Sequence, residues 1–335
     1  MDENPWMIVP LRLTLVAFWV AGGVFSSCNQ PFDPRGDLDE RPVVFSLLST
    51  DRDVQFVRVE RSYMPAGYDP LAYTSDNFVS DAAVTITNSG LTMRLRDTTL
   101  LRSDTSRFKG PLRAYVISPL RPLYGSSYAI RVESQQRVVA TASVSIPTKP
   151  FLSIDLAALA VLDRPTERDS TAEIIFPITL GNGATGYIGR FFVDYEVLKD
   201  GEWVAERVEV PTGFAYPGLH DFNYVTYGQL KPRPYMNRTS GLYTNQFYTH
   251  VLVDIAFKKY PSAKIIFDRV AFQLLQADQN LYNYSMVTHS YRDPQSIRLD
   301  EPNYSNIAGG VGMVGSYTLD SVTHTLPDFF VFNRR

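Results

Sequence analysis

The chain has 335 residues, enough for two domains, and its 44% hydrophobic and 20% charged residues are typical of a folded globular protein. Its formal net charge of −3 leaves no basic excess to neutralise a phosphate backbone, which argues against nucleic-acid binding. A single cysteine excludes an internal disulfide framework and any metal site built on several thiolates. The aromatic content of 13% favours β-structure.

The N-terminus has the pattern of a signal peptide. Leu13–Phe25 holds 13 uncharged residues after Arg12, whereas a membrane-spanning helix needs about 20 apolar residues. Asp2 and Glu3 are unusual in such a leader, and a start at Met7 would remove them, so the true start stays open between Met1 and Met7. The sequence predicts a signal peptide over residues 1–27.

The hydrophobic segment ends at Ser26-Ser27-Cys28, which resembles the lipobox of bacterial lipoproteins. In those proteins the cysteine thiol receives a diacylglyceryl group, the leader is removed before the cysteine, and the new amine is acylated. Because stable anchoring takes two or more acyl chains, a cysteine modified in this way would hold the protein on a membrane. The resemblance makes Cys28 the expected lipidation site and the N-terminal lipid the expected contact with the membrane.

Residues 28–41 form the expected tether, because Asn29–Arg41 contains two prolines, a glycine and charges of both signs. An Ig-like β-sandwich is expected over residues 42–147. Its pattern is about seven short strands with alternating apolar residues and intervening turn signals. The expected strands are Val43–Leu48, Val54–Glu60, Ala83–Thr87, Leu91–Leu95, Arg113–Ile117, Ser127–Glu133 and Val138–Ile146.

A larger, irregular β-rich domain with one helix is expected over residues 151–335. Asp278–Tyr291 lacks glycine and proline and is the expected helix, and Val311–Leu319 with Ser321–Leu326 is the expected final hairpin. The other expected strands are Ala172–Leu180, Tyr187–Leu198, Trp203–Val210, Tyr248–Phe257 and Ile265–Leu275. The predicted fold class is therefore mainly β.

The C-terminal region carries a family resemblance. Tyr282-Asn283-Tyr284 lies on the expected helix, and Asn306-Ile307-Ala308-Gly309-Gly310-Val311-Gly312-Met313-Val314-Gly315 follows. With the lipobox and the Ig-like half, these features resemble Bacteroidetes lipoproteins known only as a large domain of unknown function. That family typically shows Asn-Ile-x-Gly-Gly-x-Gly-x-Phe-Gly, and Val314 replaces the phenylalanine here. The resemblance implies an outer-membrane lipoprotein encoded beside TonB-dependent transporters, and it supplies no catalytic residues.

No motif predicts catalysis, a metal or a cofactor. Gly181–Gly186 and Gly310–Gly315 both match G-x-G-x-x-G, but a strand pattern follows each, whereas a dinucleotide site needs a helix there. The four histidines have no metal-ligand spacing, and no G-x-S-x-G occurs. Asp194 and Glu196 share one face of a strand and are expected to be exposed. We therefore expect no catalytic residues, no metal and no cofactor.

The segment from Phe214 to Tyr248 holds nine aromatic residues in 35 positions, with cations and only one acid. Either this segment is a binding loop that presents tyrosines to a protein or a sugar, or its rings fold back into the sheet. The candidate binding residues are Tyr216, Tyr224, Tyr227, Tyr235 and Tyr243.

Three functional hypotheses follow from these observations. The first is a non-enzymatic, lipid-anchored outer-membrane protein that binds or scaffolds, with a β-barrel such as a TonB-dependent transporter as its partner. The second is a surface protein that captures glycans or peptides. An envelope hydrolase ranks last, for want of a nucleophile or acid–base motif. The expected location is the outer membrane, with the cell-surface face favoured over the periplasmic face.

Overall fold

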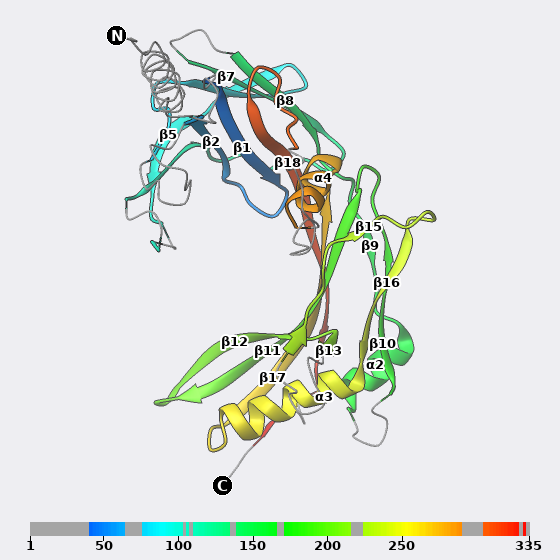
Figure 1. Cartoon of the computed structure of the whole chain (residues 1–335). Helices are drawn as coiled ribbons and strands as arrows, with labels where there is room; N and C mark the ends of the chain where they lie inside the picture. Colours follow the sequence, from blue (N-terminus) through cyan, green and yellow to red (C-terminus); the bar gives the residue numbers. More distant parts are fainter. Residues whose placement is uncertain are drawn as a thin grey trace, which may run out of the picture. The chain divides into compact units, whose positions relative to one another are not determined.

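The computed structural model describes residues 40–63, 76–102, 105–106, 110–134, 139–165, 171–215, 224–289, 304–327 and 331–332. The predicted signal peptide, Cys28 and most of the tether lie outside these residues. Strands dominate the described residues (Figure 1), which confirms the predicted mainly β class.

The N-terminal half contains two facing sheets with a shared apolar core. One sheet includes β1 (Pro42–Ser49), β2 (Gln55–Arg61), β6 (Leu112–Ile117) and β5 (Arg96–Leu100) in that order. The other has the order β4 (Leu91–Arg94), β3 (Ala83–Asn88), β7 (Ser127–Glu133) and β8 (Val139–Ser145). Alternation decides which side chains enter the core, and Val84, Ile86 and Ile130 are all buried there.

One long strand belongs to both halves of the chain. β18 (Val311–Thr325) pairs in parallel with β1 through Val311–Tyr317, and it pairs antiparallel with β17 (Ile265–Ala277) through Tyr317–Thr325. The expected final hairpin is therefore wrong, because Asp320 and Ser321 continue the strand opposite β17. The red strand β18 can be followed through both halves in Figure 1.

The C-terminal half buries an aromatic core between two sheets. β12 (Glu202–Val210), β11 (Gly186–Lys199), β17 and β18 form one layer. The other layer is β16 (Arg238–Thr244), β10 (Glu173–Thr179) and β9 (Phe151–Leu152). Phe176 of β10 stacks on Phe272 of β17 with ring centroids 4.5 Å apart, and Phe191 lies 5.1 Å from Phe176. Such pairs add to the burial of large rings.

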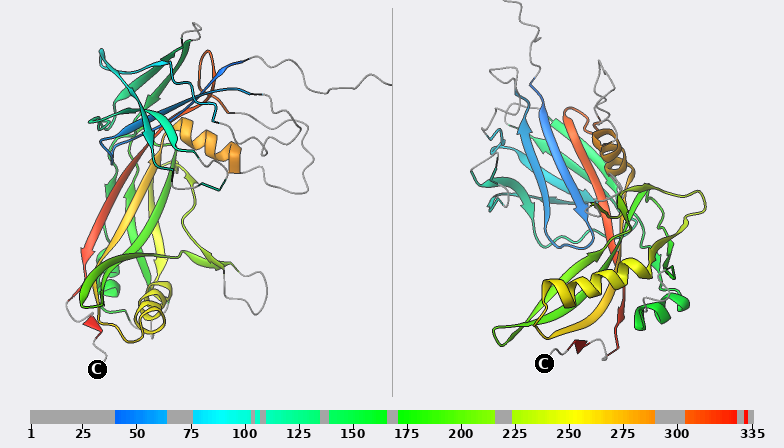
Figure 2. Two further views of the ribbon diagram at one scale, coloured as in Figure 1. Left: turned by 90° about the vertical axis from the view of Figure 1, so that its left-hand side faces the viewer. Right: turned by 60° about the horizontal axis from the view of Figure 1, so that its bottom comes forward.

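The described residues contain more helix than the single helix expected. That helix, α4 (Gln279–His289), is confirmed and packs beside β18 (Figure 2). The structure adds α2 (Leu156–Asp163) and α3 (Asn245–Val253), and α3 continues into the wider turn η4 (Asp254–Lys259). The expected strand Tyr248–Phe257 is therefore wrong. Its β-branched residues favour a strand, but Tyr248, Leu252 and Ile255 are buried at helical spacing on one face.

The aromatic segment is not one long loop. Besides β16 and the start of α3, its described residues include the hairpin β13 (Gly213–Ala215) and β14 (Tyr224–Thr226), and β15 (Lys231–Pro232). β15 pairs with the start of β11, and the short β19 (Val331–Phe332) pairs with β17.

A buried polar network lies where β18 passes from β1 to β17. The side chain of Gln276 on β17 accepts from Gly181 N at 2.7 Å and donates to Thr318 Oγ1 at 2.9 Å. Asp278 Oδ1 accepts from Leu281 N at 2.9 Å and from Ser316 N at 3.1 Å, so it joins the start of α4 to β18. These contacts satisfy groups that would otherwise be unpaired in the interior.

We predict that Asp278 makes folding depend on pH. Burial raises the pKa of its carboxyl to about 6 although backbone hydrogen bonds oppose the shift. The folded state therefore holds this proton to higher pH than the unfolded chain does, and the stability that Asp278 contributes falls as the pH rises from about 4 to about 6. In the parent chain the free energy of unfolding should decline by at most roughly 3 kcal/mol over this range, and Asp278→Asn should abolish this decline. Urea unfolding between pH 4 and 7 measures it.

Asp53→Asn, at an exposed position, is the matched control. A pH dependence in Asp278→Asn that is the same as that of the parent chain would contradict this assignment.

Candidate functional site

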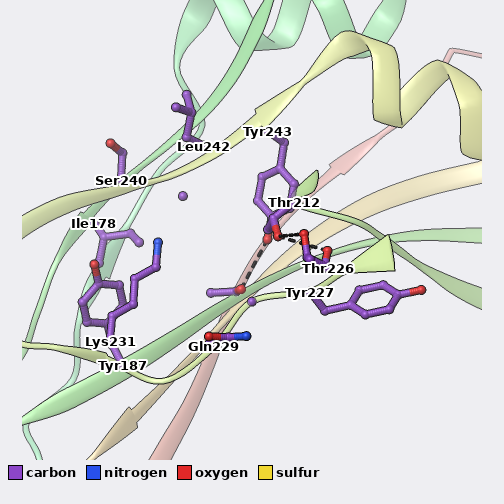
Figure 3. A pocket seen from close by; sticks show the side chains of 13 residues that line it. Ile178, Tyr187, Thr212, Thr226, Tyr227, Gln229, Lys231, Ser240, Leu242 and Tyr243 are labelled. Carbon is purple, nitrogen blue, oxygen red and sulfur yellow. Dashed lines mark hydrogen bonds between the residues drawn. The ribbon is translucent and has the colours of Figure 1, made fainter. Parts of the chain in front are cut away.

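A cleft of about 440 Å³ lies between β16 and the segment that leads from β14 to β15 (Figure 3). We call it the tyrosine cleft. Residues from five strands and two connecting segments line it, namely Ile178, Tyr187, Gly189, Thr212, Thr226, Tyr227, Gly228, Gln229, Lys231, Ser240, Gly241, Leu242 and Tyr243. Its volume is in the range of small-ligand sites.

Two glycines in the floor of the tyrosine cleft let its backbone lie directly on the aromatic core. A Cβ on Gly189 would lie 2.7 Å from the Phe272 ring, and a Cβ on Gly241 would lie 2.5 Å from the same ring. The two backbones therefore pack directly on the aromatic core. The side chain of Tyr243 reaches from β16 to β11, where its hydroxyl donates to Gly189 O at 3.3 Å. Burial raises the pKa of Tyr243, so its hydroxyl stays protonated as a donor.

The opposite wall is held against β11 by close backbone contact. A Cβ on Gly228 would lie 2.2 Å from Gly189 O, so only glycine allows the chain after β14 to approach β11 so closely. The same segment is tied to the residues before β13, because the Thr212 hydroxyl donates to Thr226 O at 3.0 Å. These contacts fix the wall that carries Tyr227.

Among the described residues that line the cleft, the only charged side chain is that of Lys231. Lys231 extends into it in Figure 3, and it makes no ion pair with any other described residue. No aspartate, glutamate or histidine is among the described residues that line the cleft. The Tyr187 hydroxyl shares a 3.1 Å hydrogen bond with Thr239. The cleft is therefore aromatic, hydroxyl-rich and positively charged.

The candidate tyrosines lie in different surroundings. Tyr227 is 46% exposed at the cleft, whereas Tyr243 is 3% exposed and contributes its hydroxyl from the core. Tyr235 is 99% exposed in the connection between β15 and β16, outside the cleft lining. Tyr216 lies outside the described residues, as does the side chain of Tyr224. The ring of Tyr243 is thus folded into the core, whereas Tyr227 and Tyr235 are exposed, and binding by these tyrosines stays a prediction.

Sequence reasoning missed Tyr187, Gln229, Ser240 and Leu242 as cleft residues. Tyr187 has the pattern of an ordinary strand residue, and only the pairing of β11 with β15 brings it opposite Lys231. The available signal in the sequence for this part of the cleft is Lys231, a cation within the aromatic segment.

A second polar cluster surrounds Glu206 on β12. Oε1 accepts from Lys199 Nζ and Tyr260 Oη, both at 2.6 Å, and Oε2 accepts from Tyr195 Oη at 2.6 Å and Lys259 Nζ at 2.8 Å. The hydrogen bonds from Lys199 and the other partners hold the pKa of Glu206 far below its usual range. A carboxylate with four partners and a depressed pKa is a poor proton acceptor near neutral pH, so we assign this cluster to anchoring η4 on β12.

The prediction that Asp194 is exposed is wrong. Asp194 is 8% exposed, whereas Glu196 two positions later is exposed as expected. Arg207 donates to its Oδ2 at 2.8 Å and Arg269 at 2.9 Å. Burial opposes ionisation, but these hydrogen bonds lower the pKa of Asp194 overall. The carboxylate therefore links three neighbouring strands, β12, β11 and β17.

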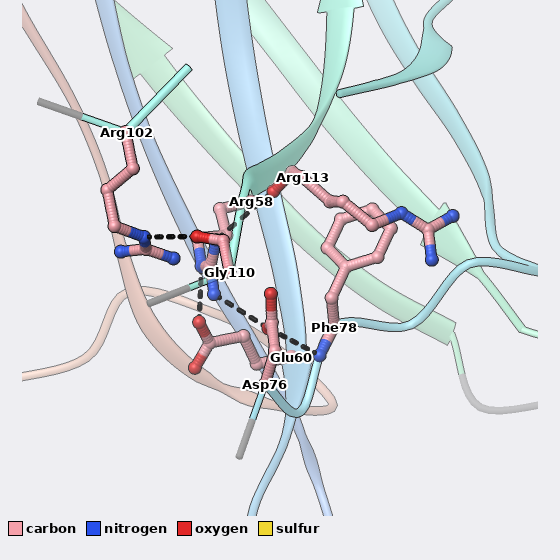
Figure 4. A network of polar contacts seen from close by, with 7 residues as sticks. All are labelled: Arg58, Glu60, Asp76, Phe78, Arg102, Gly110 and Arg113. Atoms are coloured by element: carbon pink, nitrogen blue, oxygen red, sulfur yellow. Dashed lines mark hydrogen bonds and ion pairs between the residues drawn. The ribbon is translucent and has the colours of Figure 1, made fainter. Parts of the chain in front are cut away.

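Arg58 organises a third cluster on the sandwich (Figure 4). Its guanidinium donates to Asp76 Oδ1 at 2.9 Å and to Arg113 O at 3.2 Å, and it also binds Glu60. Arg113 lies over the Phe78 ring, 4.7 Å from its centroid. The cluster joins the segment before β3 to β2 and β6, which is a structural role.

The described part of the chain has neither a metal-ligand cluster nor a membrane-spanning helix. It contains no group of three or more histidine, cysteine, aspartate or glutamate side chains placed to hold a metal ion. Nor does it contain a helix with the length and hydropathy needed to cross a membrane.

The family follows from comparison with known proteins. The chain belongs to the family described as a domain of unknown function (DUF4249), whose model matches residues 29–323. This match spans both halves of the chain and confirms the resemblance to a large domain of unknown function. No curated protein matches the chain.

We predict that Glu206→Gln destabilises the C-terminal half at neutral pH. Loss of the charge weakens the hydrogen bonds from Lys199, Lys259 and the two tyrosines, with an expected loss of roughly 1–2 kcal/mol. Because the folded pKa of Glu206 is lowered, its contribution is present above the ordinary glutamate pKa near 4.5 and declines as the pH falls below that value. Urea unfolding should therefore separate the variant from the parent at pH 7 and bring them closer at pH 3.

Glu196→Gln on β11 is the control, because this exposed side chain has no hydrogen-bond or ion-pair partner among the described residues. A difference between Glu206→Gln and the parent that does not change with pH would argue against the assignment.

Proposed function

We propose that this chain is a non-enzymatic binding protein held on the outer membrane by lipid at Cys28, with an outer-membrane β-barrel such as a TonB-dependent transporter as its partner. The tyrosine cleft carries the proposal. It offers hydroxyls, aromatic faces and one lysine, while no acidic or histidine side chain among its described residues could act as a general base. Such a lining favours recognition over chemistry.

The sequence supports the lipid anchor. Cys28 is the only cysteine and follows an uncharged segment of 13 residues behind Arg12. Residues 28–41 would supply the tether between the lipid and β1, whose first residue is Pro42. Because acyl chains hold the protein at the membrane, the folded part needs no membrane-spanning helix of its own.

An exposed aromatic turn supports a protein partner. Tyr235 is 99% exposed and the adjacent Met236 is 73% exposed, in the connection between β15 and β16. Tyrosine and methionine are enriched in the cores of protein interfaces, and two adjacent exposed residues of these types are a suitable contact for a partner. We assign this turn to the contact with the β-barrel.

The second candidate function is capture of a glycan or peptide at the surface. Tyr227 at the cleft, with an exposed ring and hydroxyl, favours it, because such a ring can stack on a sugar or cover a peptide. The two functions differ in what accompanies the purified protein. The first requires a stable β-barrel partner, and the second requires only the ligand.

We predict that Cys28→Ser abolishes both acylation and removal of the leader. The parent chain should fractionate with the outer membrane and give a mass without residues 1–27 and with acyl chains on Cys28. The variant should carry no acyl chain and should keep residues 1–27, because the leader is removed before a lipid-modified cysteine. A parent protein whose thiol is unmodified, or whose leader is retained, would contradict the lipid anchor.

We predict that the Tyr235→Ser, Met236→Ser double variant loses the β-barrel. A tagged full chain purified in mild detergent should retain the β-barrel, and the variant should retain at least about 10-fold less, since central interface residues each contribute more than about 1 kcal/mol. Leu101→Ser is the matched control, because Leu101 is 100% exposed beside β5.

Equal recovery of the β-barrel with the variant and the control would remove the turn from the interface. A parent chain that purifies without any β-barrel, and that binds oligosaccharides or peptides in a manner sensitive to Tyr227→Ala, would favour the second function.

A further inference from the structure

β16 is an edge strand whose open side borders the tyrosine cleft. It pairs with β10 on one side and with no other described strand. Four consecutive residues, Ser240–Tyr243, line the cleft. Because alternate side chains of a strand point to opposite faces, a cavity that touches four residues in succession lies against the edge of the strand and not against one face.

The contacts of β10 show which backbone groups of β16 face that edge. Ser153 N donates to Pro177 O at 3.2 Å, and Asp155 N donates to Ile175 O at 3.1 Å. Pro177 and Ile175 therefore direct their backbone groups toward the β9 side of β10. In an antiparallel pair, residues that exchange hydrogen bonds alternate with residues that do not.

The same alternation fixes the direction of each residue of β16. Pro177 is opposite Ser240 and Ile175 is opposite Leu242, so these two β16 residues do not bond to β10. Gly241, which is opposite Phe176, does bond to β10. The N–H and C=O groups of Ser240 and Leu242 thus point to the open edge, and among the described residues they have no hydrogen-bond partner.

The facing wall has unused backbone groups as well. Tyr227, Gly228 and Gln229 make no backbone hydrogen bond to any described residue. The cleft thus lies between two segments that have peptide groups without partners among the described residues, and Lys231 supplies a positive charge in it. Unpaired peptide groups at a strand edge are what an added strand uses for binding.

We propose that the tyrosine cleft binds an extended segment of a partner protein, which adds as a strand to the open edge of β16. The segment bonds to the backbone of Ser240 and Leu242, and an acidic side chain or C-terminal carboxylate of the segment pairs with Lys231. This inference rests on the proposed function, because it takes the cleft as the ligand site. It replaces an unspecified ligand with a stretch of polypeptide in β-conformation.

Leu242→Pro is the decisive variant. Proline removes the one N–H of residue 242, which points to the open edge and is not needed by the β10 pairing. Leu242→Ala is the matched control, since it removes the 51% exposed side chain and keeps the N–H. The probe is a display library of random nine-residue peptides, selected on the full chain in mild detergent, and the selected peptides are then synthesised.

The selected peptides should bind Leu242→Pro at least about 10-fold more weakly than the parent, because an unmet carbonyl acceptor costs about 1–3 kcal/mol. Leu242→Ala should bind within a few-fold of the parent. Lys231→Ala should weaken peptides that carry a carboxylate. Methylation of alternate peptide nitrogens on the bonding side should abolish binding, whereas methylation of the others should not, and this test does not depend on folding of a variant.

The outcomes separate the inference from the proposed function. If the peptides bind Leu242→Pro as well as the parent and tolerate methylation everywhere, strand addition is wrong. The cleft stays a ligand site in that case if Tyr227→Ala weakens binding. Oligosaccharide binding that is sensitive to Tyr227→Ala, with no peptide selected, also overturns the inference. If neither peptides nor oligosaccharides respond to Tyr227→Ala, the proposed function of the cleft fails as well.

A photo-crosslinking residue at position 242, in cells that make the full chain, identifies the source of the segment. The expected product is a cross-link to a partner protein, and a synthetic peptide from the cross-linked stretch should displace the library peptides. Cross-linking to short free peptides would overturn the assignment to a partner protein.

Discussion

The shared strand β18 is the constraint on which the arrangement of the described chain depends. One continuous run of 15 residues pairs with β1 at its start and with β17 at its end, so the two halves share a strand and are not joined by a free linker. Separating the halves would require breaking one of these ladders, whose backbone groups would then lack partners. The parallel pairing with β1 also explains why residues near the C-terminus complete a sandwich that begins at residue 42.

The glycine-rich motif before and within β18 serves this shared strand. The Asn306 side chain accepts from Val314 N at 2.9 Å and donates to Val314 O at 2.8 Å, so it pairs with β18 as a neighbouring backbone would. Gly312 has a φ of 118°, and a Cβ there would lie 2.2 Å from Val44 O, so glycine is needed where β18 meets β1. The motif that carries the family resemblance is thus explained by the fold and lies apart from the tyrosine cleft.

The sequence predicts local features of this fold better than it predicts their combination. All seven expected sandwich strands and α4 follow from alternation or from the absence of breakers, because these signals lie within a few residues. The continuation of β18 past Asp320 and the helix at Tyr248 depend on partners far away in the chain, namely β17 and the aromatic core. The cleft likewise combines a local signal with contacts between distant parts of the chain. Aromatic density indicated a segment that supplies part of the cleft lining, but the positions of Tyr187 and Leu242 in that lining depend on the pairings of β11 and β16.

The contrast among sheet edges is the strongest structural argument about the cleft. The edge strand β12 carries charged residues such as Glu202, Arg207 and Glu209, which is a usual defence against pairing with other chains. The bonding residues of the β16 edge, Ser240 and Leu242, are uncharged. The wall of Tyr227–Gln229 stands opposite them across the cleft, so a sheet edge of another molecule would meet this wall, whereas a single extended chain could enter the cleft. This wall therefore hinders pairing with another sheet, while the peptide groups of the β16 edge stay accessible to a single extended chain.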